Sequence, residues 1–493
     1  MSYSLIFIHM LLKTTVLLVF ILSFIFEIQT TLAQNENPNI IWLLAEDLSP
    51  DLGCYGNGIV QTPNIDQLAS NGHLYHKVFT TSPVCSPSRT ALGTGMYQNS
   101  IGAYHMRYAE KDKPELPEGI IPLTKIFNDN GYFTAKIKDE IGTGKSDWMF
   151  KVHQKPFQGN SWEDIKNHQP FFAQVNFRLT HRDFEEDKKR PISPEEVSVP
   201  PYYPDHPVVK QDWASYLESV QLLDAQVGQV IQKLKENGLY ENTIIIFFSD
   251  HGRPFTRGKC FNYESGLQIP LIISIPQNIK VPKGYKNGKE NSDLISAIDV
   301  AATSLALAGI SKPEYMEGKV FLGKEKEVKR KYIFSSTDRI GETFFKTRSI
   351  RTEKFRYNRN YNHGFSINEG ATYYRKAKHP VYHVLNILDE KGMLTSDQAR
   401  LLAPLPEEEL YDLERDPFEL QNLATAPEWQ KEKKRLSDIL DKWLEDINDK
   451  GLEEDSENIK QHFEDYRKMS FERYSEAIEK QKARVMTAIE QKP

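Results

Sequence analysis

The chain has 493 residues, of which 39% are hydrophobic and 26% charged, and its formal net charge is −6. This composition is ordinary for a globular protein and excludes both a largely disordered chain and a protein with many membrane spans. The mild acidity argues against a nucleic-acid-binding protein, because such proteins normally carry a basic excess. An anionic substrate would therefore have to be bound by a local cluster of basic side chains.

The first 33 residues have the pattern of a signal peptide. Lys13 precedes an apolar run over residues 16–26, and Thr31-Leu32-Ala33 offers small residues at the −3 and −1 positions of a cleavage site. The apolar run is short for a transmembrane helix, and an uncleaved anchor is the alternative. We therefore expect residues 1–33 to be removed from an exported protein, periplasmic or secreted, that keeps no stable membrane span.

Three apolar segments each end in polar residues. The segments are residues 39–45, 170–177 and 243–249. Continuous apolar runs of this kind are typical of buried central strands in a parallel sheet. Ligands bind beyond the carboxyl ends of such strands, so the polar residues that follow them predict a site. These residues are Glu46, Asp47, His181, Asp250 and His251.

The remaining patterns predict helices and a second sheet. Helices are expected over residues 62–69 and from about 213 to 237, where apolar side chains recur at helical spacing. Residues 346–361 alternate basic and apolar side chains, as in an antiparallel sheet with one solvated face. We expect an N-terminal catalytic domain over residues 34–325, a smaller sheet subdomain over 326–425, and a charged, helical and mostly solvated segment over 426–493.

Only three cysteines are present, Cys54, Cys85 and Cys260. Small secreted proteins stabilised by disulfides have an even number of cysteines, whereas this chain is long and has an odd number. Cys54 and Cys260 are either two buried thiols or one disulfide. In both cases Cys85 is left over and requires an explanation.

The most specific motif is Cys85-Ser86-Pro87-Ser88-Arg89, followed by Thr94-Gly95. It matches the C-x-P-x-R signature of type I sulfatases, in which the cysteine is oxidised to formylglycine. Other segments resemble the same family in the same order along the chain. They are residues 39–47, 54–57, 62–66, 249–252 and 409–417. The resemblance to the formylglycine-dependent sulfatases therefore extends from about residue 38 to 425.

This resemblance implies a fold, a nucleophile and partners. The fold would be α/β, an alkaline-phosphatase-like sandwich with a smaller C-terminal antiparallel sheet domain. The aldehyde made from Cys85 would hydrate, attack sulfur through one hydroxyl and release sulfate through the other. The partners would be a sulfated carbohydrate substrate and a formylglycine-generating or anaerobic sulfatase-maturing enzyme.

The resemblance also implies a metal site, formed by Glu46, Asp47, Cys85, Asp250 and His251. Carboxylate oxygens suit Ca²⁺, with Mg²⁺ possible. Two positions depart from the family pattern, because many members have Asp at the position of Glu46 and Asn at that of His251. A hard cation prefers oxygen to imidazole nitrogen, so His251 could ligate the metal or lie next to it.

Four further residues receive catalytic roles by resemblance. Arg89 would hold the nucleophile, Lys145 and Lys259 would contact the sulfate, and His181 would assist the leaving group. Asp147 stands where the family commonly has a histidine after the lysine, so the alignment at Lys145 departs from the pattern.

Residues 100–107 and 250–254 resemble the branch related to heparan N-sulfatase (sulfamidase), which includes bacterial polysaccharide sulfatases. In that branch the residues facing the sugar would be His105, Arg107, Asp338 and Arg339. A capped surface loop is the alternative for the first two.

The predicted reaction is hydrolysis of sulfate esters, or sulfamates, on a polysaccharide or oligosaccharide. Two alternatives remain: a phosphonate or phosphodiester hydrolase of the same superfamily, and a glycan-binding protein whose Cys85 is never matured.

Overall fold

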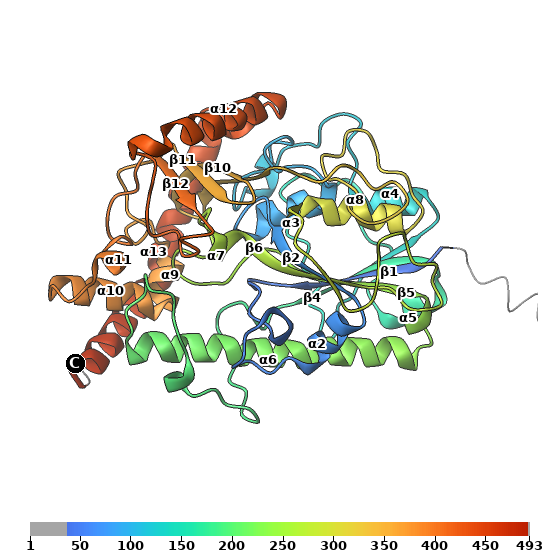
Figure 1. Cartoon of the computed structure of the whole chain (residues 1–493), viewed down its shortest axis with the longest axis horizontal. Coiled ribbons are helices and arrows are strands. Elements are labelled where there is room, and N and C mark those ends of the chain that lie inside the picture. The colour runs from blue at the N-terminus through green and yellow to red at the C-terminus, as the bar shows by residue number, and fades with distance from the viewer. Residues whose placement is uncertain (1–36, 492–493) are drawn as a thin grey trace, which may run out of the picture. The chain divides into compact units, whose positions relative to one another are not determined.

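The computed structural model describes residues 37–491 (Figure 1). The predicted signal peptide lies outside these residues. The described chain contains an eight-stranded mixed sheet and a four-stranded antiparallel sheet, as the resemblance implied. Within residues 37–491, none of the helices combines the length and the apolar character that crossing a membrane requires.

The large sheet has the strand order β3-β4-β1-β5-β6-β2-β7, and β8 pairs with β2. The bounds are β1 Asn39–Ala45, β2 His73–Phe79, β3 Phe133–Lys136, β4 Phe171–Phe177, β5 Thr243–Ser249, β6 Gln268–Ser274, β7 Lys289–Asn291 and β8 Ile295–Ser296. The parallel strands β4, β1 and β5 are adjacent, and every residue in them is buried. Burial on both faces explains why their sequences are apolar runs, and the three predicted strands are confirmed.

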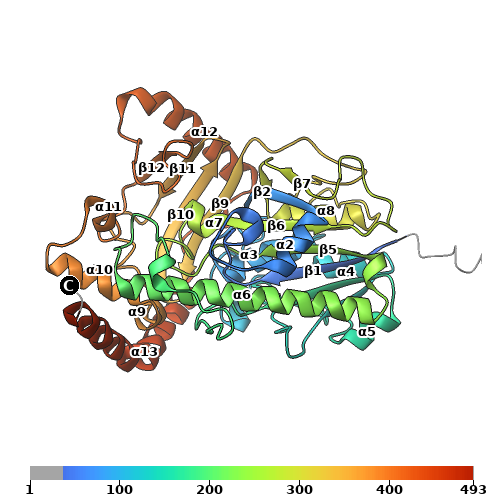
Figure 2. The ribbon, with the colours of Figure 1, turned by 60° about the horizontal axis from the view of Figure 1, so that its bottom comes forward.

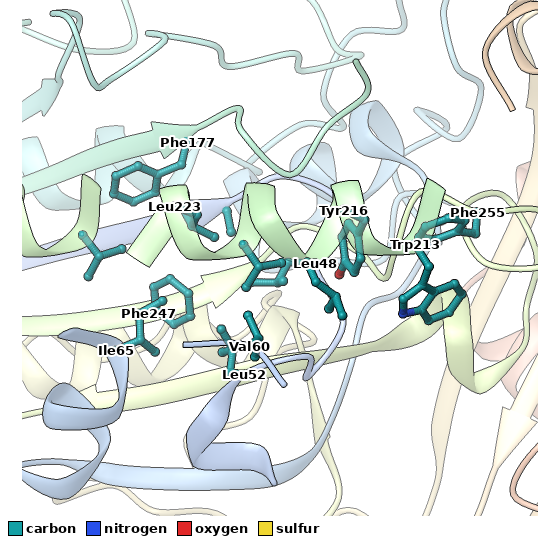
Figure 3. Close-up of a cluster of buried hydrophobic side chains, with 14 of the residues drawn as sticks. Leu48, Leu52, Val60, Ile65, Phe177, Trp213, Tyr216, Leu223, Phe247 and Phe255 are labelled. Carbon is teal, nitrogen blue, oxygen red and sulfur yellow. The ribbon is translucent and has the colours of Figure 1, made fainter. Parts of the chain in front are cut away.

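Helices cover both faces of this sheet (Figure 1). One face packs against α2 (Pro63–Ser70), α5 (Trp162–Asn167) and α6 (Pro207–Glu236). Figure 3 shows part of this layer, with Leu223 of α6 close to Phe177 and Phe247 of the sheet. The other face packs against α3 (Cys85–Thr94), α4 (Leu123–Asp129) and α8 (Ile298–Leu307).

Both predicted helices are present, and α6 is longer than expected. It begins at Pro207 rather than near residue 213. Proline suits the first position of a helix because its missing N–H would have no partner there. The preceding His206 accepts a hydrogen bond from the backbone N–H of Val208, which caps the helix at this point.

The small sheet has the order β12-β11-β10-β9. Its strands are β9 Ile333–Ile340, β10 Thr343–Arg351, β11 Phe355–Asn360 and β12 Glu408–Asp412. The antiparallel strands expected over residues 346–361 are confirmed, but the expected solvated face is wrong. Arg348, Arg351 and Arg356 are buried, because carboxylates of Asp338, Asp449 and Glu264 neutralise them.

The remaining helices lie mostly in the C-terminal part of the chain. They are α7 Glu264–Leu267, α9 Tyr373–Lys378, α10 Pro380–Glu390, α11 Ser396–Ala399, α12 Gln430–Asp446 and α13 Glu457–Gln491. Short 3₁₀ turns occupy Gly53–Tyr55, Glu110–Asp112, Pro194–Glu196, Tyr240–Asn242, Pro427–Trp429 and Lys450–Leu452. Figure 2 shows α13 packed beside α9 and α10. Much of α13 is exposed, as expected, but Phe463, Val485 and Ile489 are buried.

Candidate active site

The carboxyl ends of β1, β4 and β5 meet at one edge of the large sheet. The backbone N–H of Asp47 donates to the Asp250 carboxylate at 3.0 Å, which joins the ends of β1 and β5. Asp47 has a φ of 54°, in the left-handed region that is uncommon for a residue other than glycine. The fold therefore holds Asp47 in an unusual conformation at the end of β1.

Cys85 lies beside these carboxylates, at the first position of α3. Its Sγ atom is 3.3 Å from His251 Nε2 and 3.9 Å from Asp47 Oδ1. Burial opposes ionisation of this thiol, but the charges of Lys259, Lys145 and His251 outweigh it and lower the pKa of Cys85. The environment of Cys85 is therefore built to stabilise negative charge.

Four side chains gather as a possible metal-binding group: Asp47, Cys85, Asp250 and His251. Their ligand atoms all lie within 4.8 Å of one another. Nδ1 of His251 lies 2.9 Å from the Gly252 carbonyl oxygen and donates to it, so Nε2 is directed at Asp47 Oδ1, 3.1 Å away. Two buried carboxylates at this spacing fit a hard divalent cation.

Glu46 lies outside that group. Its carboxylate oxygens are 3.1 Å from Lys145 Nζ and 3.5 Å from Arg89 Nη2. Lys145 is partly exposed, and its carbonyl oxygen accepts a hydrogen bond from Asn176 of β4. Glu46 thus holds two of the predicted catalytic cations in place.

Arg89 and Lys259 bring further positive charge to the site. Arg89 is one helical turn after Cys85, and its Nε donates to Asp250 at 2.9 Å. Both terminal nitrogens of Arg89 are buried without a hydrogen-bond partner in the described part of the chain, so they can bind an additional anionic group. Lys259 Nζ lies 2.9 and 2.7 Å from the two carboxylate oxygens of Asp47.

His181 follows the end of β4. Its Nδ1 atom lies 2.6 Å from the Arg182 carbonyl oxygen, to which it donates, and this leaves Nε2 as the reactive nitrogen. The positive charge of Lys259, and then burial, lower the pKa of His181 below 6.5. A lowered pKa favours the neutral imidazole at pH 7.

A cavity of about 190 Å³ opens onto this centre. Four of the predicted residues line it: Asp47, Arg107, His181 and Lys259. Its other walls contain residues that the sequence analysis missed, including Glu342, Tyr374, Arg375, Tyr466, Ser470 and Tyr474. The spacing of the three residues from α13, every fourth position, marks one helix face, but their segment was expected to be mostly solvated.

Arg107 is the one residue of the predicted sugar-facing set that lines this cavity. Its guanidinium donates to the Asp147 carboxylate at 2.9 Å, and half of its side chain is exposed. His105 and Arg339 instead bind the two oxygens of Asp455, at 2.8 and 2.6 Å. They do not line the cavity, and their ion pairs fasten the segment that precedes α13.

Asp338, the fourth member of the set, is buried and does not line the cavity either. Arg348 binds its carboxylate at 3.0 Å, and burial nonetheless raises the pKa of Asp338 to about 7.

The structure also decides between a disulfide and two thiols for the other cysteines, because Cys54 and Cys260 are both free thiols. Cys54 is only partly buried, whereas Cys260 is buried and lines the cavity.

Comparison with known proteins identifies the family. A family model described as Sulfatase matches residues 38–153 and 158–310, and one described as N-sulphoglucosamine sulphohydrolase, C-terminal, matches residues 255–394. An ulvan-active sulfatase of Formosa agariphila is 34% identical over 470 residues, covering 84% of this chain and 76% of that protein. N-sulphoglucosamine sulphohydrolase of Homo sapiens is 27% identical over 464 residues, covering 82% of this chain and 89% of that protein.

Solved structures show the same fold. A 2-O GAG sulfatase has a TM-score of 0.62 at 20% identity, covering 85% of this chain and 95% of that one. The phosphonate monoester hydrolase of Agrobacterium radiobacter has a TM-score of 0.60 at 18% identity, and the match covers 84% of this chain and 97% of that one. The fold is alkaline-phosphatase-like.

The Sulfatase family model matches more than half of this chain. The chain therefore belongs to the sulfatase family and is an enzyme of that family. Within the family, the second model and the two relatives support membership of the sulfamidase-like branch.

Proposed function

We propose that the protein removes sulfate groups from a sulfated polysaccharide or oligosaccharide through a formylglycine made from Cys85. The observation that carries the proposal is the convergence of Lys145, Lys259 and Arg89 on one buried cysteine. A sulfate ester is anionic, so its hydrolysis requires fixed positive charge around the reacting atom. Hydrated formylglycine would supply one hydroxyl for attack on sulfur and a second for release of sulfate.

The basic side chains of the site have different roles. Lys145 and Lys259 attract the sulfate oxygens and stabilise the charge that develops on them. Arg89, whose buried terminal nitrogens make no hydrogen bond within residues 37–491, holds the oxygen of the nucleophile. His181 donates a proton to the leaving oxygen from Nε2, because a bound sulfate would raise the lowered pKa of this imidazole.

A Ca²⁺ or Mg²⁺ ion held by Asp47, Asp250 and His251, next to residue 85, would polarise the sulfate oxygens. The donor set fits such an ion, since two carboxylates approach each other in a fully buried position. Glu46 orients Lys145 and Arg89 rather than completing this group.

The substrate class is inferred from the relatives and from the charges of the cavity. The relatives are named for ulvan and for N-sulphoglucosamine. Arg107 and Arg375 bring positive charge to the cavity, while Tyr374 and Tyr466 offer aromatic faces to a sugar ring. The predicted signal peptide favours action outside the cytoplasm, where polysaccharides are encountered. A maturation enzyme would first oxidise Cys85.

A phosphonate or phosphodiester hydrolase is the second candidate, and the observation that favours it is the fold shared with a phosphonate monoester hydrolase. Both reactions need a nucleophile, a cation and basic side chains. Turnover of an aryl sulfate compared with a phosphonate monoester and a phosphodiester by the same preparation decides between them.

The test of the proposal is sulfate release from a panel of O-sulfated and N-sulfated glycans, including ulvan and heparan oligosaccharides. Mass spectrometry first establishes that Cys85 has been converted to formylglycine. We expect release from at least one glycan and none from Cys85→Ala. Confirmed formylglycine with no release from any glycan would overturn the proposal, and faster phosphodiester cleavage would replace it with the second candidate.

A further inference from the structure

A second hollow adjoins the active-site cavity. It is a groove of about 1130 Å³ between the start of α6, the junction of α9 and α10, and the last turns of α13. Figures 1 and 2 both show α13 beside α10 in this region. Arg182 lines both hollows, so a chain that leaves the cavity past this residue enters the groove.

The boundary between the two hollows is fixed. The Arg182 guanidinium binds both oxygens of Asp212, at 2.7 and 2.5 Å, and its Nε donates to the Pro254 carbonyl oxygen at 3.1 Å. Tyr374 donates to the Arg182 carbonyl oxygen at 3.4 Å and packs edge-on against Tyr474 at 5.8 Å. The charge of Arg182 is therefore neutralised, and two aromatic rings stand where a sugar chain would pass.

One face of α13 connects the cavity to the groove. Tyr466, Ser470 and Tyr474 line the cavity, and the same face continues along the groove with Ala477, Gln481, Arg484 and Ala488. Intervals of three and four residues keep these side chains on one side of the helix. At about 1.5 Å per residue, Tyr474 and Arg484 are about 15 Å apart along the helix axis, which is longer than a single sugar unit requires.

The groove carries uncompensated positive charge. Its two acidic residues are already paired, Asp212 with Arg182 and Asp183 with Lys378 at 2.8 Å. Lys480 and Arg484 also line the groove, are exposed, and have no ion pair among residues 37–491. On a chain whose net charge is −6, two free cations in one groove mark a local site for an anion.

We propose that this groove binds the continuation of an anionic glycan chain, beyond the sugar whose sulfate is removed. The inference rests on the proposed function, because that function places the end of the chain in the adjoining cavity. Lys480 and Arg484 would bind sulfate or carboxylate groups of the following units. Gln211 and Gln481 offer amides to the hydroxyl groups, and apolar side chains such as Val208 face the C–H surfaces of the sugars.

The test compares short and long substrates. The double variant Lys480→Ser/Arg484→Ser removes both free charges from the groove, and Lys468→Ser/Lys482→Ser removes two exposed charges of the same helix that do not line it. Each matured protein is assayed on a sulfated disaccharide and on an eight-unit oligosaccharide of the same polymer. For the groove variant we expect KM for the longer substrate to rise roughly tenfold, with KM for the disaccharide unchanged.

Binding is measured in parallel with the same two oligosaccharides, on the full chain carrying Cys85→Ala with and without the groove substitutions. We expect the longer one to bind more tightly, and to lose that advantage in the groove variant. Equal affinity for both lengths, or equal losses in the groove and control variants, would overturn the groove site while leaving sulfate release intact. Failure of both lengths to bind and to react would instead remove the proposed function as well.

Discussion

Around Cys85, three carboxylates face three cations in a space from which water is largely excluded. The carboxylates belong to Glu46, Asp47 and Asp250, and the cations to Arg89, Lys145 and Lys259. Removing one member of such a set reduces the free energy of unfolding more than removing a partner of an exposed ion pair does, because the remaining charge stays buried without compensation. Single substitutions therefore test both the roles and the arrangement.

Lys259→Met should lower sulfate turnover about a hundredfold or more, because in the proposed function Lys259 stabilises the charge that develops on the sulfate. Steady-state kinetics of the matured enzyme on an aryl sulfate measures the loss. Lys312→Met, a partly buried lysine paired with Glu327, is the control and should retain full turnover. A kcat for Lys259→Met equal to that of the control would remove Lys259 from the mechanism.

His73 provides a prediction about pH. It is buried on β2 with no hydrogen-bond partner for either ring nitrogen in the described chain, and burial lowers its pKa to about 4. Between pH 6.5 and 4 the unfolded chain takes up a proton that the folded protein does not, so stability falls as the pH falls through this range. His73→Phe removes this effect and keeps the stack on Tyr75.

Thermal unfolding of wild type and His73→Phe at pH 8 and pH 5 measures the difference. We expect the melting temperature of the variant to exceed that of wild type by roughly two to four degrees at pH 5, and by little at pH 8. An equal difference at both pH values would mean that His73 does not titrate as inferred.

At the scale of elements, α3 must lie close enough to the chain around Trp148 to place Cys85. A Cβ atom on Gly93 would lie 2.6 Å from Trp148 Nε1, so this contact requires glycine. Gly93→Ala should reduce the free energy of unfolding by about 1–3 kcal/mol, because the buried indole has to move. Denaturant unfolding measures this cost. Gly58→Ala, which meets open space, is the matched control and should show no loss.

The segment that leads into α13 is fastened by one carboxylate. Asp455 binds both His105 and Arg339, and Asp455→Asn keeps its shape while removing its charge. We expect the free energy of unfolding to fall by about 1–3 kcal/mol. Amide exchange at the start of α13 should become faster, because this part of the cavity wall is less firmly attached. Glu453→Gln changes an exposed partner of Lys450 nearby and should have no effect. Unchanged exchange in Asp455→Asn would show that α13 is held by its apolar contacts alone.

For the whole molecule, a divalent cation held by Asp47, Asp250 and His251 would link the ends of β1 and β5 beside α3, and its binding energy would add to folding stability. Removing it with a chelator should lower stability by about 2.7 kcal/mol relative to a concentration one hundred times the Kd. Thermal unfolding against added Ca²⁺ and Mg²⁺, with elemental analysis of the purified protein, checks this without any activity assay. A melting temperature insensitive to both ions would argue against the site, and Asp250→Asn should abolish any response.

Much of this arrangement could be predicted from the order of residues. The three central strands are apolar runs because both of their faces are covered, and the polar residues that follow them lie where the carboxyl ends of parallel strands form a site. Cys85, Arg89, Asp47 and Asp250 come together because neighbouring parallel strands and one helix bring their ends to the same edge. These are local patterns, and local patterns can be read without coordinates.

The tertiary structure alone decided which of the remaining residues line the cavity. Glu46 pairs with Arg89 and Lys145 and lies outside the compact group that contains Asp47 and Asp250. His105 and Arg339 bind Asp455 and do not line the cavity. Such pairings join residues that are far apart in the sequence, and the charge of a side chain does not say which opposite charge it will meet. The sequence by itself determined the family and the main strands and predicted Cys85 as the nucleophile, whereas the cavity wall formed by α13 depends on packing between distant segments.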